Sequence, residues 1–126
     1  GITLEYETKT VMISVNPELF SRLLVNLVSN AYRYGRENGH IRVRLWQEDS
    51  SLVLSVADDG IGIARNEQEK IFRRFYQADA SRGGEGTGLG LAMVYEIARF
   101  YHGTVTVESV VDQGSTFVVR MPAGQS

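Results

Sequence analysis

The sequence predicts a single α/β domain of the α+β type, a two-layer sandwich in which helices cover one face of a mixed, mostly antiparallel sheet. Its hydrophobic patterns follow the order ββ-α-ββ-α-loop-α-ββ, and strands that come in adjacent pairs favour hairpins over crossovers. The length of 126 residues, 43% of them hydrophobic, is enough for one buried core and too short for two. We therefore expect residues 1–126 to form one domain.

The composition excludes several classes of protein. Thirteen Lys and Arg against fifteen Asp and Glu give a formal charge of −2, without the basic excess typical of nucleic-acid or membrane-surface binding. The chain has no Cys, and its two His, His40 and His102, are expected to be exposed loop and helix-end side chains. No apolar run approaches the ~20 residues that cross a bilayer. We expect a cytoplasmic domain, and the start at Gly1 indicates a piece of a longer protein.

The first half of the chain gives clear local signals. Alternating apolar residues predict strands at 2–6 and 11–15. Asn16-Pro17-Glu18 predicts a helix start, with Asn16 as the N-cap and proline at the first helical position. Apolar residues then recur at spacings of three and four as far as Tyr34, and Gly35 ends the helix.

The next patterns predict a hairpin, with strands at 41–45 and 52–56 joined by a turn at 48–51. A short helix at 67–75, a polar glycine-rich loop at 77–88 and an apolar helix at 89–101 are expected to follow. The chain then ends in a second hairpin, with strands at 104–108 and 117–121 and a turn at 113–114. A structureless loop as long as residues 77–88 is unusual in a small domain unless it is functional or disordered.

Three polar side chains share one flank of the first predicted helix. At 100° per residue, Asn26 and Asn30 lie roughly 40° apart, with Arg33 on the same flank beside the apolar stripe. A solvated polar face explains any one of these residues. Together, amide oxygens beside a cation suit a magnesium-phosphate site.

The segment Asp58-Asp59-Gly60-Ile61-Gly62 follows a predicted buried strand. A carboxylate there is costly unless a partner binds it, and the two glycines let a flat ligand approach the backbone. An ordinary Asp-Gly turn is the alternative explanation.

Glycines at 83, 84, 86, 88 and 90 lead directly into the apolar helix, where unpaired N–H groups and the helix dipole favour an anion. The spacing is neither the dinucleotide fingerprint nor a P-loop.

Four segments then resemble the sequence boxes of the sensor histidine kinases. Residues 27–34 resemble the N box, 58–63 the G1 box, 71–76 the F box and 86–92 the G2 box, in the family's order and spacing. Gly114-Ser115-Thr116-Phe117 and Met121-Pro122 also fit. The whole chain is similar to the catalytic and ATP-binding domain of the gyrase, heat-shock-90, histidine-kinase and mismatch-repair ATPase superfamily, whose Bergerat-type fold is a sandwich of the kind predicted above.

The resemblance implies a role for each matching residue. Asn30 would bind Mg²⁺ that bridges the ATP phosphates, with Asn26 assisting beside it. Arg33 would contact phosphate, and Tyr34 would border the adenine. Asp58 would accept a hydrogen bond from the adenine amino group.

The resemblance extends the ATP-binding set to the glycine-rich segments. Gly60 and Gly62 would make room for the base, and Phe72 and Phe75 would anchor the near end of a lid over the nucleotide. The full set implied for ATP is Asn26, Asn30, Arg33, Tyr34, Asp58, Gly60, Gly62, Ile63, Phe75, Gly86, Thr87, Gly88, Leu89 and Gly90, with Asn30 as the metal ligand. Two residues depart from the F-box pattern, Arg73 where an acid is usual and Gln77 where a base is common, and both bear on docking of the lid or of the phosphoacceptor domain.

The residue at position 26 bears on the reaction. Members of the superfamily that hydrolyse ATP resemble one another in carrying Glu there, one helical turn before the magnesium Asn, whereas this chain has an amide that is a poor general base. Phosphoryl transfer needs mainly positioning and charge neutralisation. The resemblance thus implies transfer of the γ-phosphoryl group of Mg-ATP to a histidine.

That phosphoacceptor histidine would lie on a separate dimerising helical hairpin of the same kinase, so we expect no phosphoacceptor in this chain. A response regulator would receive the phosphoryl group. We expect this piece to be monomeric, its full-length parent to be a homodimer, and its place to be the cytoplasmic end of a membrane-anchored sensor, without nucleic acid as a partner. An anti-sigma-type serine kinase and a non-catalytic nucleotide-sensing module are the alternatives.

Overall fold

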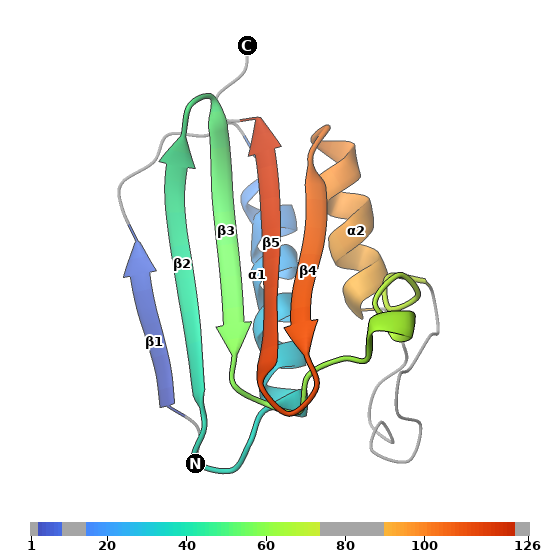
Figure 1. Cartoon of the computed structure of the whole chain (residues 1–126). Helices are drawn as coiled ribbons and strands as arrows, with labels where there is room; N and C mark the ends of the chain where they lie inside the picture. Colours follow the sequence, from blue (N-terminus) through green and yellow to red (C-terminus); the bar gives the residue numbers. More distant parts are fainter. Residues whose placement is uncertain (1–2, 9–14, 74–89, 123–126) are drawn as a thin grey trace.

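The computed structural model describes residues 3–8, 15–73 and 90–122. The elements in chain order are β1 (Thr3–Thr8), α1 (Pro17–Tyr34), β2 (His40–Glu48), β3 (Ser51–Asp58), the short 3₁₀ helix η1 (Arg65–Glu67), α2 (Gly90–Phe100), β4 (Thr104–Val110) and β5 (Gly114–Pro122) (Figure 1). Residues 11–14 of the second predicted strand lie outside the described residues.

The five strands form one sheet in the order β1-β2-β3-β5-β4. β1 pairs with β2 in parallel, and the other three pairs are antiparallel. The chain between the two parallel strands passes through α1, because a parallel pair needs a crossover connection. The predicted mixed, mostly antiparallel sheet is confirmed.

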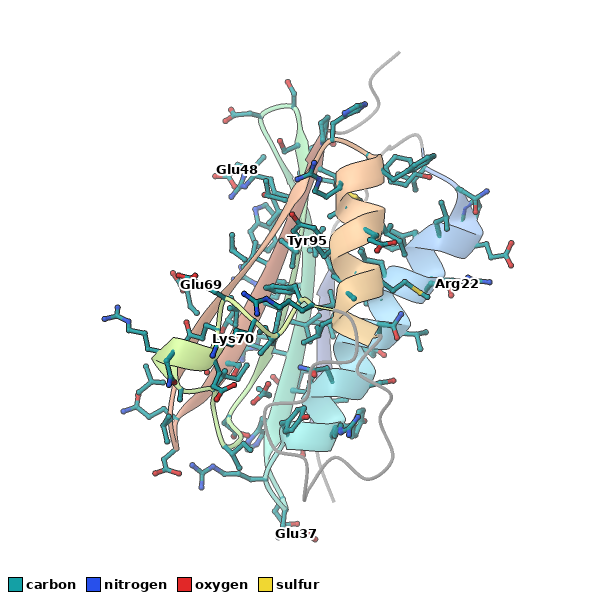
Figure 2. All side chains as sticks on the ribbon, turned by 90° about the vertical axis from the view of Figure 1, so that its right-hand side faces the viewer. Arg22, Glu37, Glu48, Glu69, Lys70 and Tyr95 are labelled. Carbon is teal, nitrogen blue, oxygen red and sulfur yellow. The ribbon has the colours of Figure 1, made fainter. Side chains whose placement is uncertain are left out.

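Both α-helices lie on the same face of the sheet, and within the residues that the structure describes no α-helix covers its other face (Figures 1 and 2). The core fills the space between these two layers, which confirms the predicted sandwich. Its buried side chains come from α1 (Leu23, Leu27, Ala31), from α2 (Val94, Ile97, Ala98) and from the inward positions of the strands (Ile41, Val43, Leu52, Leu54, Val56, Phe117, Val119, Met121).

Helix α1 begins where the capping signal predicts. The side-chain oxygen of Asn16 accepts hydrogen bonds from the amides of Glu18 (2.8 Å) and Leu19 (3.0 Å), and Pro17 is the first helical residue. These two amides have no partner within the helix, so the cap satisfies them. The first helix is therefore predicted correctly from its cap to its last residue.

The predicted helix at 67–75 is wrong over its described part. After the 3₁₀ turn Arg65–Glu67, the amides of Lys70 and Arg73 each bond to the carbonyl three residues earlier, and no α-helix forms. Ile71 is 6% exposed, and its neighbour Phe72 also packs against the core. Two adjacent side chains face the core together more readily in a turn than in a helix, where they point about 100° apart.

The helix-free face of the sheet is covered by long polar side chains. Arg44 lies over the ring of Trp46, with its guanidinium carbon 5.0 Å from the ring centroid. Val53 lies between Trp46 and Arg120 in the strand register and is fully buried although it faces this side. The apolar stems of such side chains keep water from the sheet while their charged ends remain exposed.

Candidate functional site

The segment after β3 lies directly against the end of α1. The amide of Ile61 donates to the carbonyl of Tyr34 (3.1 Å). A Cβ atom at Gly60 would lie 2.0 Å from that same carbonyl oxygen and 2.8 Å from the Cα of Gly35, so only glycine fits here. The structure therefore brings together Asp58, Gly60 and Tyr34, which are far apart in the sequence.

Asp58, the last residue of β3, is half-buried. One carboxylate oxygen accepts a hydrogen bond from the amide of Gly60 (2.9 Å). Burial raises the pKa of Asp58, and the nearby charge of Asp59 adds to this, against a lowering by the Gly60 and Ser115 amides. A carboxylate that is partly removed from water in this way gains from a further hydrogen-bond donor.

Asp59 has a different role from its neighbour. Its carboxylate accepts a hydrogen bond from the His40 amide (2.9 Å) and lies 3.2 Å from Nδ1 of the same residue. The His40 amide is the main cause that lowers the pKa of Asp59, and the imidazole contributes less. Asp59 therefore fastens the segment to the start of β2.

Gly62 lies against the turn between β4 and β5. Its φ is +74°, and a Cβ there would lie 2.2 Å from the carbonyl oxygen of Val110 and 2.8 Å from the Cα of Val111. Backbone packing thus explains both glycines of the Asp-Gly segment without reference to a ligand. Room for a base beside Gly60 and Gly62 stays a prediction.

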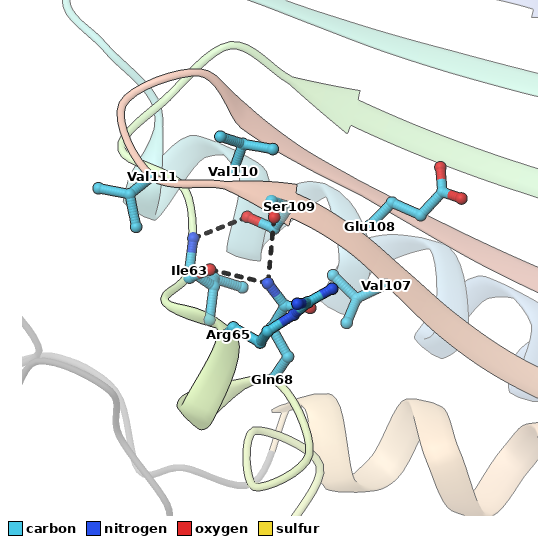
Figure 3. A pocket seen from close by; sticks show the side chains of 8 residues that line it. All are labelled: Ile63, Arg65, Gln68, Val107, Glu108, Ser109, Val110 and Val111. Atoms are coloured by element: carbon cyan, nitrogen blue, oxygen red, sulfur yellow. Dashed lines mark hydrogen bonds between the residues drawn. The ribbon is translucent and has the colours of Figure 1, made fainter.

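A hydrogen-bond network supports the segment on its other side (Figure 3). The amide of Ile63 donates to the hydroxyl of Ser109 (2.7 Å), and the side-chain amide of Gln68 donates to the carbonyls of Ile63 (2.9 Å) and Ser109 (3.1 Å). These residues line an open cleft of about 540 Å³ along β4. Ser109 and Gln68 were not among the residues predicted from the sequence, since neither belongs to a recognisable motif.

Asn26 lies where α1 meets the first turn of α2. Its side-chain amide donates to the carbonyl of Arg22 (2.8 Å) and lies 3.5 Å from the sulfur of Met93. A Cβ at Gly90 would lie 3.3 Å from the Asn26 side-chain oxygen. This flank of α1 therefore lies beside the start of α2, a contact that was not predicted from the sequence.

The remaining residues of the flank lie toward the C-terminal end of α1. Asn30, Arg33 and Tyr34 are half-buried, at the margin of the core as the helical spacing predicts. The guanidinium carbon of Arg33 is 5.6 Å from the centroid of the Tyr34 ring. The C-terminal end of α1, which bonds to the segment after Asp58 through the Tyr34 carbonyl, thus carries an amide, a cation and an aromatic ring.

The predicted lid is described only at its two flanks. Phe72 packs edge-on against Phe117, with ring centroids 6.1 Å apart, and lies 6.2 Å from Tyr95 of α2. Gly90 begins α2. Five predicted site residues, Phe75, Gly86, Thr87, Gly88 and Leu89, lie outside the described residues.

Within the described ranges, no helix has both the length and the apolar character needed to span a bilayer. The same residues contain no group of three or more His, Cys, Asp or Glu side chains placed to hold a metal ion. The role of Asn30 as a metal ligand stays a prediction.

The family described as histidine kinase-, DNA gyrase B- and HSP90-like ATPase matches residues 15–125, and the chain belongs to it. The chain is 36% identical over 123 residues to the circadian input-output histidine kinase CikA of Synechococcus elongatus, and 40% identical over 109 residues to the sensor histidine kinase RppB of Synechocystis sp.. These alignments cover 96% and 85% of this chain but only 16% and 24% of the relatives. The chain therefore spans less than a quarter of these curated kinases.

Solved structures give the same result for the fold. A mycobacterial sensor histidine kinase, MprB, superimposes with a TM-score of 0.88 at 25% identity, covering 99% of this chain and 86% of that one. The catalytic domain of the histidine kinase ThkA gives a TM-score of 0.84 at 27% identity, covering 98% and 82%. Full-length ShkA in complex with AMPPNP superimposes with a TM-score of 0.86 at 27% identity. This match covers 100% of this chain and 26% of ShkA. The fold is that of a histidine kinase catalytic domain, as the sequence boxes predicted.

Proposed function

We propose that this chain binds Mg-ATP and transfers the γ-phosphoryl group to a histidine on a separate dimerisation domain of the same sensor kinase, from which a response regulator receives it. The observation that carries the proposal is the half-buried Asp58 carboxylate, held at the end of β3 next to the end of α1. Membership of the ATPase family and the similarity to ShkA, solved with AMPPNP, support a nucleotide as the ligand.

In the proposed site the adenine amino group donates a hydrogen bond to the Asp58 carboxylate. Because this carboxylate is partly removed from water, a hydrogen bond from a ligand stabilises it. Tyr34 borders the base, and the segment that carries Gly60, Gly62 and Ile63 lies beside it. A carboxylate that accepts from an amino group selects adenine over bases with a carbonyl at that place.

We place the phosphates along the polar flank of α1. Arg33 supplies the positive charge, and Asn30 supplies an oxygen ligand to Mg²⁺, a hard cation that prefers oxygen and keeps several waters. A single neutral amide cannot hold this ion alone, so the donor set fits Mg²⁺ that arrives with ATP, with the phosphates as its main ligands. Asn26 lies one turn earlier and completes this flank.

The rest of the proposed arrangement follows the same family likeness. Phe75, Gly86, Thr87, Gly88, Leu89 and Gly90 form the lid side of the ATP site. The whole chain, 1–126, acts as a monomeric ATP-binding catalytic domain within a longer homodimeric kinase. We place it at the cytoplasmic end of a membrane-anchored sensor.

Titration calorimetry with ADP and AMPPNP, with and without Mg²⁺, tests the binding step. We expect both to bind, and we expect Mg²⁺ to strengthen AMPPNP binding because Asn30 contributes only one ligand. Absence of binding under all four conditions would refute the proposal.

Transfer is tested by mixing the chain, γ-labelled ATP and the separately produced phosphoacceptor domain of the parent kinase. We expect acid-labile label on that domain and none on His40 or His102. Acid-stable label on a serine of a partner would instead indicate the serine-kinase alternative. Nucleotide binding without transfer to the phosphoacceptor domain would indicate a sensing module.

The identity of residue 26 gives a prediction about hydrolysis. We expect wild-type chain to release phosphate from Mg-ATP very slowly, and Asn26→Glu to release it faster, because a carboxylate one turn from Asn30 can accept a proton from water. A well-placed general base is worth about 10²–10⁴-fold, and a grafted one should give less. Steady-state phosphate release at saturating Mg-ATP is the measurement. Asn26→Gln is the matched control, and rapid hydrolysis by the wild type would contradict the assignment as a transferase.

A further inference from the structure

Arg36 contacts two backbone carbonyl groups from different parts of the chain. It lies just beyond the end of α1, and its Nε donates to the carbonyl of Asp59 (2.6 Å). Its Nη2 donates to the carbonyl of Asp112, in the turn between β4 and β5. One guanidinium group therefore joins the connections that follow α1, β3 and β4.

The backbone links the same three connections. The carbonyl of Ile61 accepts from the amide of Asp112 (2.8 Å), and the amide of Ile61 donates to the end of α1. A Cβ at Gly114 would lie 2.1 Å from the carbonyl oxygen of Asp58. The turn between β4 and β5 thus packs on one side of Asp58, and Arg36 holds the next carbonyl along the chain.

We propose that Arg36 is a positioning residue for nucleotide recognition, acting through Asp58 and not through a contact with the nucleotide. By fixing the carbonyl of Asp59, it sets the direction of the Asp58 carboxylate toward the adenine amino group. The proposal rests on the ATP binding proposed above. A guanidinium suits this role because its rigid planar donors can serve two carbonyl groups at once, whereas an ammonium is a single point charge.

The test compares ADP with IDP, whose base has a carbonyl where adenine has the amino group. Arg36→Met keeps most of the apolar stem and removes the donors, and Arg36→Lys keeps the charge. Arg120→Met is the matched control. Arg120 is an exposed arginine of β5 that pairs with Glu48 of β2 (3.2 Å), away from the Asp58 end of the sheet. Calorimetry gives the dissociation constant of each nucleotide, and thermal melting confirms that each variant is folded.

We expect Arg36→Met to weaken ADP binding about tenfold, equivalent to about 1.4 kcal/mol, and to change IDP binding by less than about twofold. Arg36→Lys should fall between wild type and Arg36→Met for ADP, and Arg120→Met should change neither constant. Equal weakening of ADP and IDP would show general disruption and overturn the positioning role. Unchanged ADP binding would overturn it as well.

A second measurement needs no nucleotide. In the nucleotide-free protein, amide hydrogen exchange at Ile61 and Asp112 should be faster in Arg36→Met than in wild type and unchanged in Arg120→Met, because Arg36 closes the same set of connections. If the wild type binds neither nucleotide, the proposed function fails, and this exchange alone decides whether Arg36 holds the segment. Unchanged exchange in Arg36→Met would refute that holding role.

Discussion

Asp58→Asn is expected to weaken ADP binding and, at the same time, to make the folded protein more stable. The amide keeps an oxygen that can accept from the Gly60 amide, but it loses the charge offered to the nucleotide. Loss of one hydrogen bond to a charged group costs about 1.5–3 kcal/mol, or roughly a ten- to hundredfold increase in the dissociation constant. Calorimetric titration with ADP measures the first effect, and thermal melting without nucleotide measures the second.

The stability effect has a definite sign and pH dependence. Burial raises the pKa of Asp58, so the folded chain holds this proton more tightly than the unfolded chain. The ionised carboxylate therefore opposes folding at neutral pH, and this opposition disappears as the pH falls from the raised folded pKa to the ordinary unfolded one. The difference in melting temperature between Asp58→Asn and wild type should be largest at neutral pH and should shrink through that window.

Asp59→Asn is the matched comparison. The His40 amide lowers the pKa of Asp59, so its ionised form stabilises the fold above the ordinary pKa of an aspartate, and this contribution is lost as the pH falls through the folded pKa. At neutral pH the Asp59 variant should melt at a lower temperature, opposite to Asp58→Asn. A fall in melting temperature for both variants would contradict the different roles of the two acids.

Gly60→Ala is expected to destabilise the fold by about 3–5 kcal/mol, at the upper end of what a single substitution does. The added methyl would lie 2.0 Å from the Tyr34 carbonyl oxygen and 2.8 Å from the Cα of Gly35, and both are backbone atoms that cannot move alone. Urea unfolding followed by the fluorescence of Trp46, the only tryptophan, gives the free energy of unfolding.

Gly90→Ala is the control for that substitution. Among the described residues its Cβ would meet only the side chain of Asn26, at 3.3 Å, and alanine is the better helix former by about 1 kcal/mol. We therefore expect a change within about 1 kcal/mol. Equal stability of the Gly60 and Gly90 variants would show that the segment after β3 is not packed against α1 as described.

Local signals in the sequence were enough to predict most of the fold. The Asn16 cap, the following proline and Gly35 mark the ends of α1, and period-two alternation marks β2 to β5. The helix predicted at residues 67–75 is wrong over its described part, residues 67–73, because apolar spacing alone favours a helix there. The structure instead uses turns, which bury Ile71 and Phe72 together.

The candidate site was predictable only where a motif carries it. Asp58, Asn26 and Asn30 were found because of their residue types and spacing. In the structure Asp58 is the last residue of β3, and the two asparagines lie on α1. Arg36 and Ser109 were not found, because their partners are backbone groups from distant segments that leave no pattern in the sequence. Contacts of this kind become visible only when the fold brings the loops together.

The central pairing of β3 with β5 has a consequence for chain length. These strands adjoin in the sheet but are far apart in the sequence, and the proposed site residues from Gly60 to Gly90 lie in the long loop that their pairing closes, whereas those of α1 lie before it. The entropy of closing a flexible loop grows only with the logarithm of its length, so doubling such a loop costs roughly 0.6 kcal/mol. Residues 74–89 lie inside this loop, between Phe72 on the core and the start of α2. By loop closure alone, added length between β3 and β5 should therefore change the free energy of the sheet little.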